Sequence, residues 1–141
     1  AGGQYLDLNY EKKKIKKNKI IEMQIKKTGK LFAFCCMAPA LIANKKTNVL
    51  RFFENIGYKI GLLFQITDDL IDYKGISKKA GKKTKKDEKK GKATLISLLG
   101  YKNTIKYNIK IKNNILNKID YYGKKSENLK KTVLFIYERD K

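Results

Sequence analysis

The stretch from Thr47 to about Tyr73 constrains the fold most, because its apolar residues recur with helical spacing. After Gly61 the turns are apolar almost all round, and a helix of that kind is buried among neighbours. Gly57 and Gly61 lie one turn apart and leave room for the close approach of a second helix. The sequence therefore predicts a central helix that is packed on several sides.

Composition favours an all-α chain with one domain. The 141 residues are 42% hydrophobic, which is enough for a modest core despite 33% charged residues. Pro39 is the single proline, and no Asn-Gly or Asp-Gly hairpin turn occurs. Further helices are expected over 18–44 with a kink at Pro39, over 94–99, over 103–121, and after Ser126 as a cap.

The remaining segments are expected to be less regular. Residues 1–17 begin with a glycine pair and become rich in lysine, so we expect an irregular connection. Gly75–Gly91 combines glycine and lysine without apolar periodicity, and we expect a mobile loop that closes over a bound anion. In the helix over 103–121 the expected inward stripe is 105, 109, 112, 116 and 119, with Lys112 as its flaw.

Cysteine usage and hydropathy predict a cytoplasmic protein without a membrane span. The two cysteines, Cys35 and Cys36, are adjacent, so a disulfide between them would be strained, and no histidine completes a metal-ligand set. We interpret them as core thiols in a reducing compartment. No run of 18 apolar residues occurs, and the first residues lack the pattern of a signal peptide.

The formal net charge of +21 leaves two interpretations open. A basic protein of this kind could bind nucleic acid or anionic lipid. Alternatively, lysine, isoleucine and asparagine share A/T-rich codons, so base composition could load the surface with lysine. Of the 34 basic residues only Arg51 and Arg139 are arginines. Readers of nucleic acid favour arginine and interleaved aromatic residues, which makes the compositional interpretation the stronger one.

Three carboxylates interrupt the apolar stretch FQITDDLIDYKG. Asp68 and Asp72 are one helical turn apart, and Asp69 flanks the same face, with Gln65 one turn earlier. Like charges at this spacing repel, and a hard divalent cation such as Mg²⁺ would neutralise them and keep waters that a phosphate can replace. The plainer interpretation is a solvated acidic face at a helix end, with Lys74 as partner.

Two lysine-bearing segments favour the metal interpretation. Lys82 and Lys92 each follow a glycine in the loop after the aspartates, and such lysines can fold back onto an anion held by metal ions. Lys27 and Thr28 place a cation and a hydroxyl within the helix expected over 18–44. Taken by itself, Lys27 would be interpreted as a solvated surface lysine. Together with the carboxylates, these residues indicate a diphosphate site.

These motifs resemble the trans-isoprenyl diphosphate synthases, and most closely the bacterial type of farnesyl diphosphate synthase. The order and approximate spacing match over essentially the whole chain, in GGQYLDL at 2–8, KTGKL at 27–31, GLLFQITDDLID at 61–72 and GKKTKKDEKKGKATL at 81–95. The ending FIYERDK is similar to the short basic C-terminus of that group. FQxxDDxxD followed by GKxxxxDxxxxGKxT is a specific combination.

The resemblance implies a bundle of α-helices around a deep apolar cavity, with two aspartate-rich motifs holding Mg²⁺ at its mouth. The enzyme ionises an allylic diphosphate, and the double bond of isopentenyl diphosphate attacks the carbocation. Asp68, Asp69 and Asp72 match the second metal-binding motif. Lysines that bind the allylic diphosphate in the family are matched by Lys27, Lys82 and Lys92. Groups beside the developing cation are matched by Thr28 and Gln65, and polar residues near the cavity are matched by Gln4 and Asp7.

The chain also departs from the family pattern. DDxxD occurs once, and the first aspartate-rich motif with its following arginines has no counterpart. The resemblance thus implies a C-terminal half of a synthase domain over 1–141. Such a half would be inactive alone, would expose an apolar face around Gly57–Ile71, and would belong to a homodimer when complete. The alternatives are a basic helical nucleic-acid-binding protein and a non-catalytic remnant that pairs with a full-length synthase.

Overall fold

The computed structural model describes residues 2–11, 13–79 and 94–139, and this part of the chain consists of helices and short connections, with no strand. The α-helices are α1 (Gly2–Asn9), α2 (Lys17–Gln24), α3 (Lys30–Ile42), α4 (Thr47–Lys79), α5 (Leu95–Leu99), α6 (Tyr101–Ile119) and α7 (Glu127–Glu138). A π-helix, η1 (Ile25–Gly29), joins α2 to α3, and a 3-10 segment, η2 (Asp120–Ser126), joins α6 to α7. The all-α prediction is confirmed.

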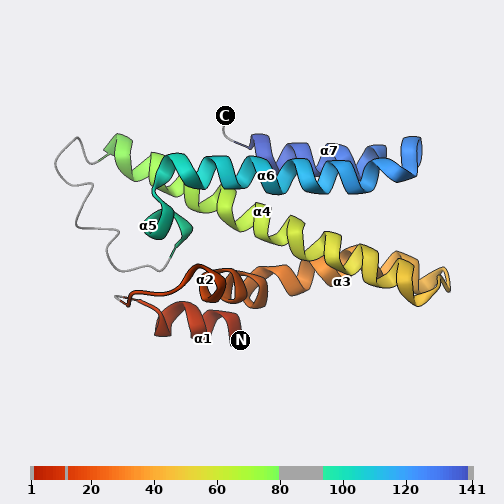
Figure 1. Cartoon of the computed structure of the whole chain (residues 1–141), viewed down its shortest axis with the longest axis horizontal. Coiled ribbons are helices and arrows are strands. Elements are labelled where there is room, and N and C mark those ends of the chain that lie inside the picture. The colour runs from red at the N-terminus through yellow and green to blue at the C-terminus, as the bar shows by residue number, and fades with distance from the viewer. Residues whose placement is uncertain (1, 12, 80–93, 140–141) are drawn as a thin grey trace.

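The long helix α4 runs through the middle of the molecule. In Figure 1 the helices α6 and α7 lie along one side of α4, and α1, α2 and α3 lie along the other. The α4 side chains Ile56, Ile60, Leu63 and Ile66 are buried, and they pack with residues from α2, α6 and α7. The prediction of a central, buried helix is therefore confirmed, and α4 can present different faces to two groups of helices.

The crossing of α3 and α4 depends on two glycines. A Cβ atom added at Gly57 would lie 2.4 Å from the Cα atom of Ala33, and one added at Gly61 would lie 2.6 Å from the Cα atom of Gly29. Both neighbours are backbone atoms, which cannot rotate away. The predicted close approach at Gly57 and Gly61 is confirmed, and it brings the π-helix η1 against the turn before the aspartates.

Two segments that we expected to be irregular are helical. Residues 2–9 form α1, although the sequence begins with two glycines. Gly3 is buried, and a Cβ atom there would lie 2.1 Å from the backbone nitrogen of Lys27, so tertiary packing outweighs the poor helix propensity of glycine. Helix α4 continues past Gly75 to Lys79. The rest of the expected loop, 80–93, lies outside the described residues.

The inward stripe of α6 agrees with the expected positions only at Ile119, which is buried. The other buried residues are Thr104, Asn108, Ile111 and Ile115, each one position before the expected 105, 109, 112 and 116. The polar members have partners that make burial possible: the Thr104 hydroxyl donates to the Gly100 carbonyl at 2.9 Å, and the Asn108 amide donates to Thr67 Oγ1 at 3.0 Å. Lys112 is then free to place its ammonium 4.6 Å from the Tyr137 ring centroid.

Helix starts agree with the sequence in part. The helix expected over 94–99 is α5, and Thr94 is its cap rather than its first residue: Thr94 Oγ1 accepts from the Ser97 backbone N–H at 3.2 Å, and Ser97 Oγ accepts from the Thr94 N–H at 3.1 Å. Ser126 precedes α7 as expected, but its hydroxyl donates back to the Gly123 carbonyl and makes no capping bond. Helix α3 passes through Pro39 and ends at Ile42.

In the part of the chain that the structure describes, α3 and not the segment Gly57–Ile71 carries the largest group of exposed apolar side chains. Leu31, Phe34, Leu41 and Ile42 of α3 are all more than half exposed. The expected uncovered face on α4 is wrong, because helices on both sides bury Ile60, Leu62, Leu63 and Ile66. Among the described helices, none combines the length and the hydrophobicity that crossing a membrane requires.

Candidate active site

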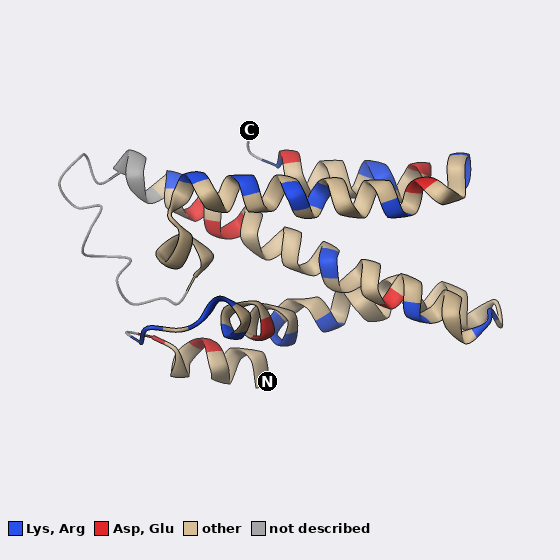
Figure 2. Cartoon of the chain, viewed as in Figure 1, with Lys and Arg blue, Asp and Glu red and all other residues tan. Residues whose placement is uncertain are grey.

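The three aspartates of α4 line one cavity. It has a volume of about 270 Å³, and its other lining residues come from α1, α2, η1, the preceding turn of α4 and the start of α5: Asp7, Met23, Gln24, Lys27, Gln65 and Thr94. Figure 2 shows the acidic stretch of α4 in red, within a chain whose charged residues are mostly blue. The shared cavity agrees with the helical spacing of Asp68, Asp69 and Asp72.

Asp69 is held by two glutamine amides. Gln24 Nε2 donates to Asp69 Oδ2 at 3.1 Å, and Gln65 Nε2 lies 3.5 Å from Asp69 Oδ1. The Thr28 hydroxyl donates to Gln65 Oε1 at 3.1 Å, which extends the network to η1. Thr28, Gln65 and Asp69, singled out from the sequence, are therefore joined by contacts, and Gln24 is a member that sequence reasoning missed.

The π-helix η1 places Lys27 at the cavity and Thr28 against Gln65, which lines it. Its wide turn follows directly after Gln24 and ends at Gly29, which packs against Gly61 of α4. Short π-helical turns inside α-helices are frequent at functional sites. Lys27 Nζ lies 2.6 Å from Asp7 Oδ2, so the contact between α1 and η1 brings a cation and a carboxylate to the cavity rim.

Arg139 compensates Asp68. Its guanidinium donates to Asp68 Oδ1 and, at 3.4 Å, to the Phe64 carbonyl, and its central carbon lies 4.2 Å from the Phe64 ring centroid. Burial raises the pKa of Asp68, and this outweighs the opposing effect of Arg139; the neighbouring Asp72 charge raises the pKa further. Sequence reasoning noted the FIYERDK ending but did not connect Arg139 with the aspartates.

The donor chemistry fits a hard divalent cation, although the described residues form no ready cluster of three metal ligands. Carboxylate oxygens are the ligands that Mg²⁺ prefers. In this arrangement the Asp69 oxygens accept from amides and Asp68 faces Arg139, so these two carboxylates are held separately. The three aspartates thus supply oxygen donors from one side of the cavity.

For the three remaining residues predicted for the site, Gln4, Lys82 and Lys92, the described structure gives no contact with this arrangement. Gln4 is exposed on α1 and is not among the described residues that line the cavity. Lys82 and Lys92 lie outside the described residues. The roles of all three stay predictions. A signal for Gln24 was available, since it precedes Lys27 by three residues and Thr28 by four and so shares their helix face.

Comparison with known proteins gives a consistent family. The model of the polyprenyl synthetase family matches residues 1–134. Farnesyl diphosphate synthase from Bacillus subtilis is 32% identical over 113 residues, which are 78% of this chain and 38% of that protein. The farnesyl diphosphate synthase from Geobacillus stearothermophilus is 32% identical over 126 residues, or 87% of this chain and 42% of that protein.

Solved structures share the fold. A putative farnesyl-diphosphate synthase from Marinomonas superposes with a TM-score of 0.78 at 27% identity, over 97% of this chain and 46% of that one. A geranyltransferase from Helicobacter pylori, complexed with magnesium and isoprenyl diphosphate, superposes with a TM-score of 0.73 at 25% identity. The superposition covers 95% of this chain and 44% of that one. The chain spans less than half the length of these relatives.

Proposed function

Because the chain belongs to the polyprenyl synthetase family, we propose that its acidic cavity is one wall of a prenyltransferase active site that binds the diphosphate of an allylic substrate. The observation that carries the proposal is the convergence of three carboxylates, Lys27 and Gln65 on a single cavity. The similar geranyltransferase from Helicobacter pylori is complexed with magnesium and isoprenyl diphosphate, which supports a prenyl diphosphate as the ligand.

Each residue has a defined task in this proposal. Asp68, Asp69 and Asp72 would hold Mg²⁺, which when bound neutralises charge on the diphosphate leaving group. Lys27 leaves Asp7 to contact a diphosphate oxygen, since a dianionic ligand competes well for an ammonium. Gln65 and Thr28 form a polar pair beside the cavity, positioned to face a developing positive charge with their oxygen atoms.

For the whole protein we propose condensation of isopentenyl diphosphate with the allylic diphosphate, as geranyl or farnesyl diphosphate synthesis requires. The allylic C–O bond breaks, the double bond of isopentenyl diphosphate attacks the carbocation, and a proton passes to the departing diphosphate. We also propose that the complete enzyme is a homodimer in the cytoplasm. The exposed α3 face supports the dimer. The free thiols of Cys35 and Cys36 fit a reducing compartment, although Cys35 is exposed and is not the core thiol that we expected.

Calorimetric titration of the chain with inorganic diphosphate, with and without Mg²⁺, tests the ligand class. We expect saturable binding that depends on Mg²⁺ and weakens at least about tenfold in Asp69→Asn and Asp72→Asn, because each variant removes an anionic donor. Asp120→Asn, on the exposed 3-10 segment with Lys130 as its partner, is the matched control and should bind as the native chain does. The proposal would be contradicted if the chain bound diphosphate equally well with and without Mg²⁺. It would also be contradicted if all three variants bound diphosphate as tightly as the native chain.

Activity needs a separate assay with radiolabelled isopentenyl diphosphate, an allylic diphosphate and Mg²⁺. The described carboxylates occupy one wall only, so we expect no turnover by the 141 residues alone and some turnover when the N-terminal half of a homologous synthase is added. Robust turnover by the chain alone would overturn the view that its cavity is one wall of a larger site.

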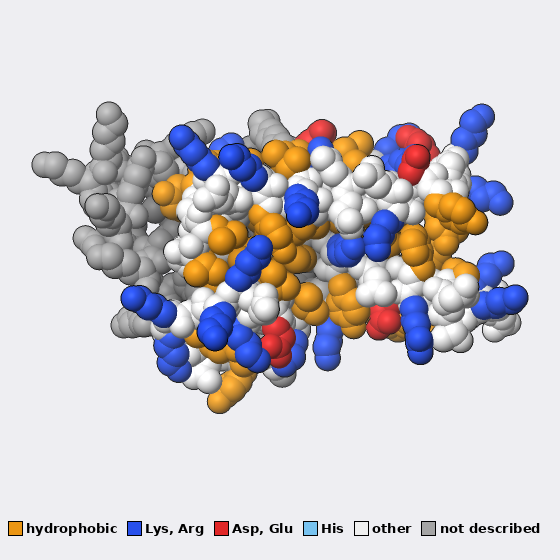
Figure 3. Space-filling view, viewed as in Figure 1, with side chains coloured by type: hydrophobic (Ala, Val, Ile, Leu, Met, Phe, Trp, Pro, Cys, Tyr) orange, Lys and Arg blue, Asp and Glu red, His pale blue; other side chains and the backbone are white. Residues whose placement is uncertain are grey.

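The nucleic-acid alternative is tested by the same samples. On the face shown in Figure 3, lysine side chains are scattered rather than gathered into one patch, which favours the compositional origin of the charge. Salt-dependent binding of duplex DNA, without Mg²⁺-dependent binding of diphosphate, would instead favour a nucleic-acid role.

A further inference from the structure

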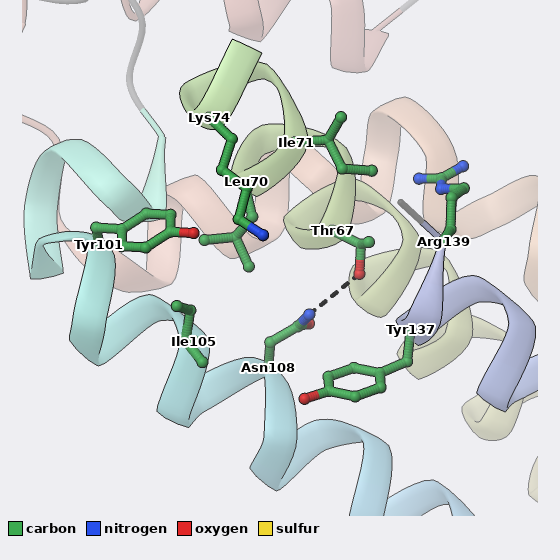
Figure 4. Close-up of a pocket in the computed structure, with 9 residues that line it drawn as sticks. All are labelled: Thr67, Leu70, Ile71, Lys74, Tyr101, Ile105, Asn108, Tyr137 and Arg139. Carbon is green, nitrogen blue, oxygen red and sulfur yellow. Dashed lines mark hydrogen bonds between the residues drawn. The ribbon is translucent and has the colours of Figure 1, made fainter. Parts of the chain in front are cut away.

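A second cavity lies between α4, α6 and α7, and it shares no lining residue with the acidic cavity (Figure 4). Its volume is about 140 Å³. Leu70, Ile71 and Ile105 supply apolar walls, and tyrosines from α6 and α7 line it as well. A cavity of about 150 Å³ with apolar walls is large enough to hold a benzene ring. The space is therefore suited to one ring-sized molecule.

Asn108 contributes a buried hydrogen-bond acceptor that has no donor among the described residues. The residue is 2% exposed, and its Nδ2 donates to Thr67 Oγ1 at 3.0 Å. Its Oδ1 is buried and has no hydrogen-bond partner among the described residues. A buried carbonyl oxygen without a donor is unfavourable, and native proteins nearly always provide one. The cavity thus calls for an occupant that donates a hydrogen bond at Asn108.

The charged residues at the cavity specify the other end of the occupant. Lys74 and Arg139 are lining residues, and no carboxylate is among the described residues that line the space. Arg139 Nε is buried and, like Asn108 Oδ1, has no partner among the described residues. Figure 4 shows Lys74 directing its ammonium from α4 toward the α6 side of the cavity, where Asn108 lies. The Arg139 guanidinium already pairs with Asp68 through Nη2, so the Arg139 Nε and the Lys74 ammonium are the cationic donors left for an occupant, and such donors favour a carboxylate.

We infer that this cavity is a binding site for a small hydroxy acid with a ring-sized apolar body. The body fills the space between Leu70, Ile71 and Ile105, the hydroxyl donates to Asn108 Oδ1, and the carboxylate accepts from Lys74 and Arg139. This site shares no lining residue with the diphosphate site, although Arg139 joins the two through Asp68, and its ligand needs no metal. The competing explanation is an ordered water at Asn108 with no ligand.

Titration of the native chain without Mg²⁺, followed by ligand-observed NMR or calorimetry, distinguishes these explanations. The probes are 4-hydroxybenzoate, phenol and toluene. Phenol and toluene have similar size, but only phenol can donate to Asn108, so we expect phenol to bind about tenfold more tightly than toluene. We expect 4-hydroxybenzoate to bind more tightly still, at one molecule per chain.

Variants locate the contacts. Asn108→Leu keeps the side-chain volume and should reduce phenol to the affinity of toluene, whereas Asn113→Leu, on the exposed side of the same helix, should change neither. Lys74→Met should remove the advantage of 4-hydroxybenzoate over phenol. If Asn108→Leu does not fold, judged by circular dichroism, the comparison of phenol with toluene on the native chain decides alone. Absence of saturable binding, which would leave water as the occupant, or equal affinity for phenol and toluene would overturn the inference.

Discussion

Gln24 links the residues identified from the sequence to a partner that only the structure reveals. It is 2% exposed, its Nε2 donates to Asp69 at 3.1 Å, and it lines the acidic cavity. A carboxylate that binds a metal depends on such neighbours for its orientation. The spacing of Asp68, Asp69 and Asp72 could be predicted because helical periodicity fixes it. The sequence places Gln24 on the helix face of Lys27 and Thr28, but the contacts of Gln24 and Arg139 with their aspartates could not be predicted, because 45 and 71 residues separate the partners.

Replacing Gln24 by leucine should therefore weaken Mg²⁺-dependent binding of diphosphate by about tenfold, the usual cost of losing a residue that orients a metal ligand. Calorimetric titration measures the change. Asn113→Leu is the control for an equivalent replacement at an exposed position and should bind normally. An unchanged affinity in Gln24→Leu, with the fold intact, would show that Asp69 does not need this contact.

A second residue-scale prediction concerns Glu22, which joins α2 to η1. Hydrogen bonds from Lys26 at 2.8 Å and Lys19 at 3.0 Å lower the pKa of Glu22 to about 2. A lowered pKa in the folded state contributes stability that is complete above the ordinary value of 4.5 and is lost as the pH falls toward 2. Lys26→Met should raise the pKa of Glu22 toward 4.5. Carbon-detected NMR titration of the side-chain carboxyl measures it, and an unchanged midpoint would exclude Lys26 as the main cause.

At the scale of elements, the α3–α4 crossing is the contact that the sequence predicted best. Gly57 and Gly61 stand one turn apart in an apolar helix, and this pattern allows few structures other than a close crossing. Helix α1 was missed because its stability comes from Gly3 packing on the backbone of Lys27, which no local pattern encodes. The α6 stripe was displaced because Asn108, judged as polar and outward, pairs with Thr67 in the interior.

The crossing should respond sharply to one methyl group. Gly57→Ala should lower the free energy of unfolding by about 2–3 kcal/mol, because the new Cβ meets backbone atoms of Phe32 and Ala33 at 2.4 Å and forces the helices apart. Urea unfolding measures the loss. Gly75→Ala lies in the same helix with nothing within 4 Å and should instead stabilise by about 0.5–1 kcal/mol. Equal effects of the two substitutions would be evidence against the close crossing.

At the scale of the whole molecule, the exposed apolar face of α3 determines how the chain behaves in solution. Leu31 is 67% exposed and Phe34 is 58% exposed, on a helix that also leaves Leu41 and Ile42 open. A contiguous apolar face of this kind normally marks a contact surface. The sequence predicted an uncovered face but assigned it to the central helix, because the number of helices covering α4 could not be known from periodicity.

We expect the isolated chain to self-associate through this face, and the double variant Leu31→Gln with Phe34→Gln to shift it toward monomer. Sedimentation velocity over a range of concentrations measures the distribution. The matched control replaces Tyr121 and Phe135, two exposed aromatic residues on other elements, by glutamine and should leave the distribution unchanged. A native chain that remains monomeric at all concentrations would contradict this role of α3.

The separation in sequence between the partners of Asp68 and Asp69 has a consequence for the order in which the molecule assembles. Helices α3 and α4 are joined by the short connection 43–46, so their contact closes a small loop and forms early. Arg139 lies 71 residues after Asp68. During synthesis the aspartates therefore leave the ribosome before the arginine that compensates them. The acidic wall stays electrostatically incomplete until α7 docks, so its geometry depends on a contact that forms later than the α3–α4 crossing.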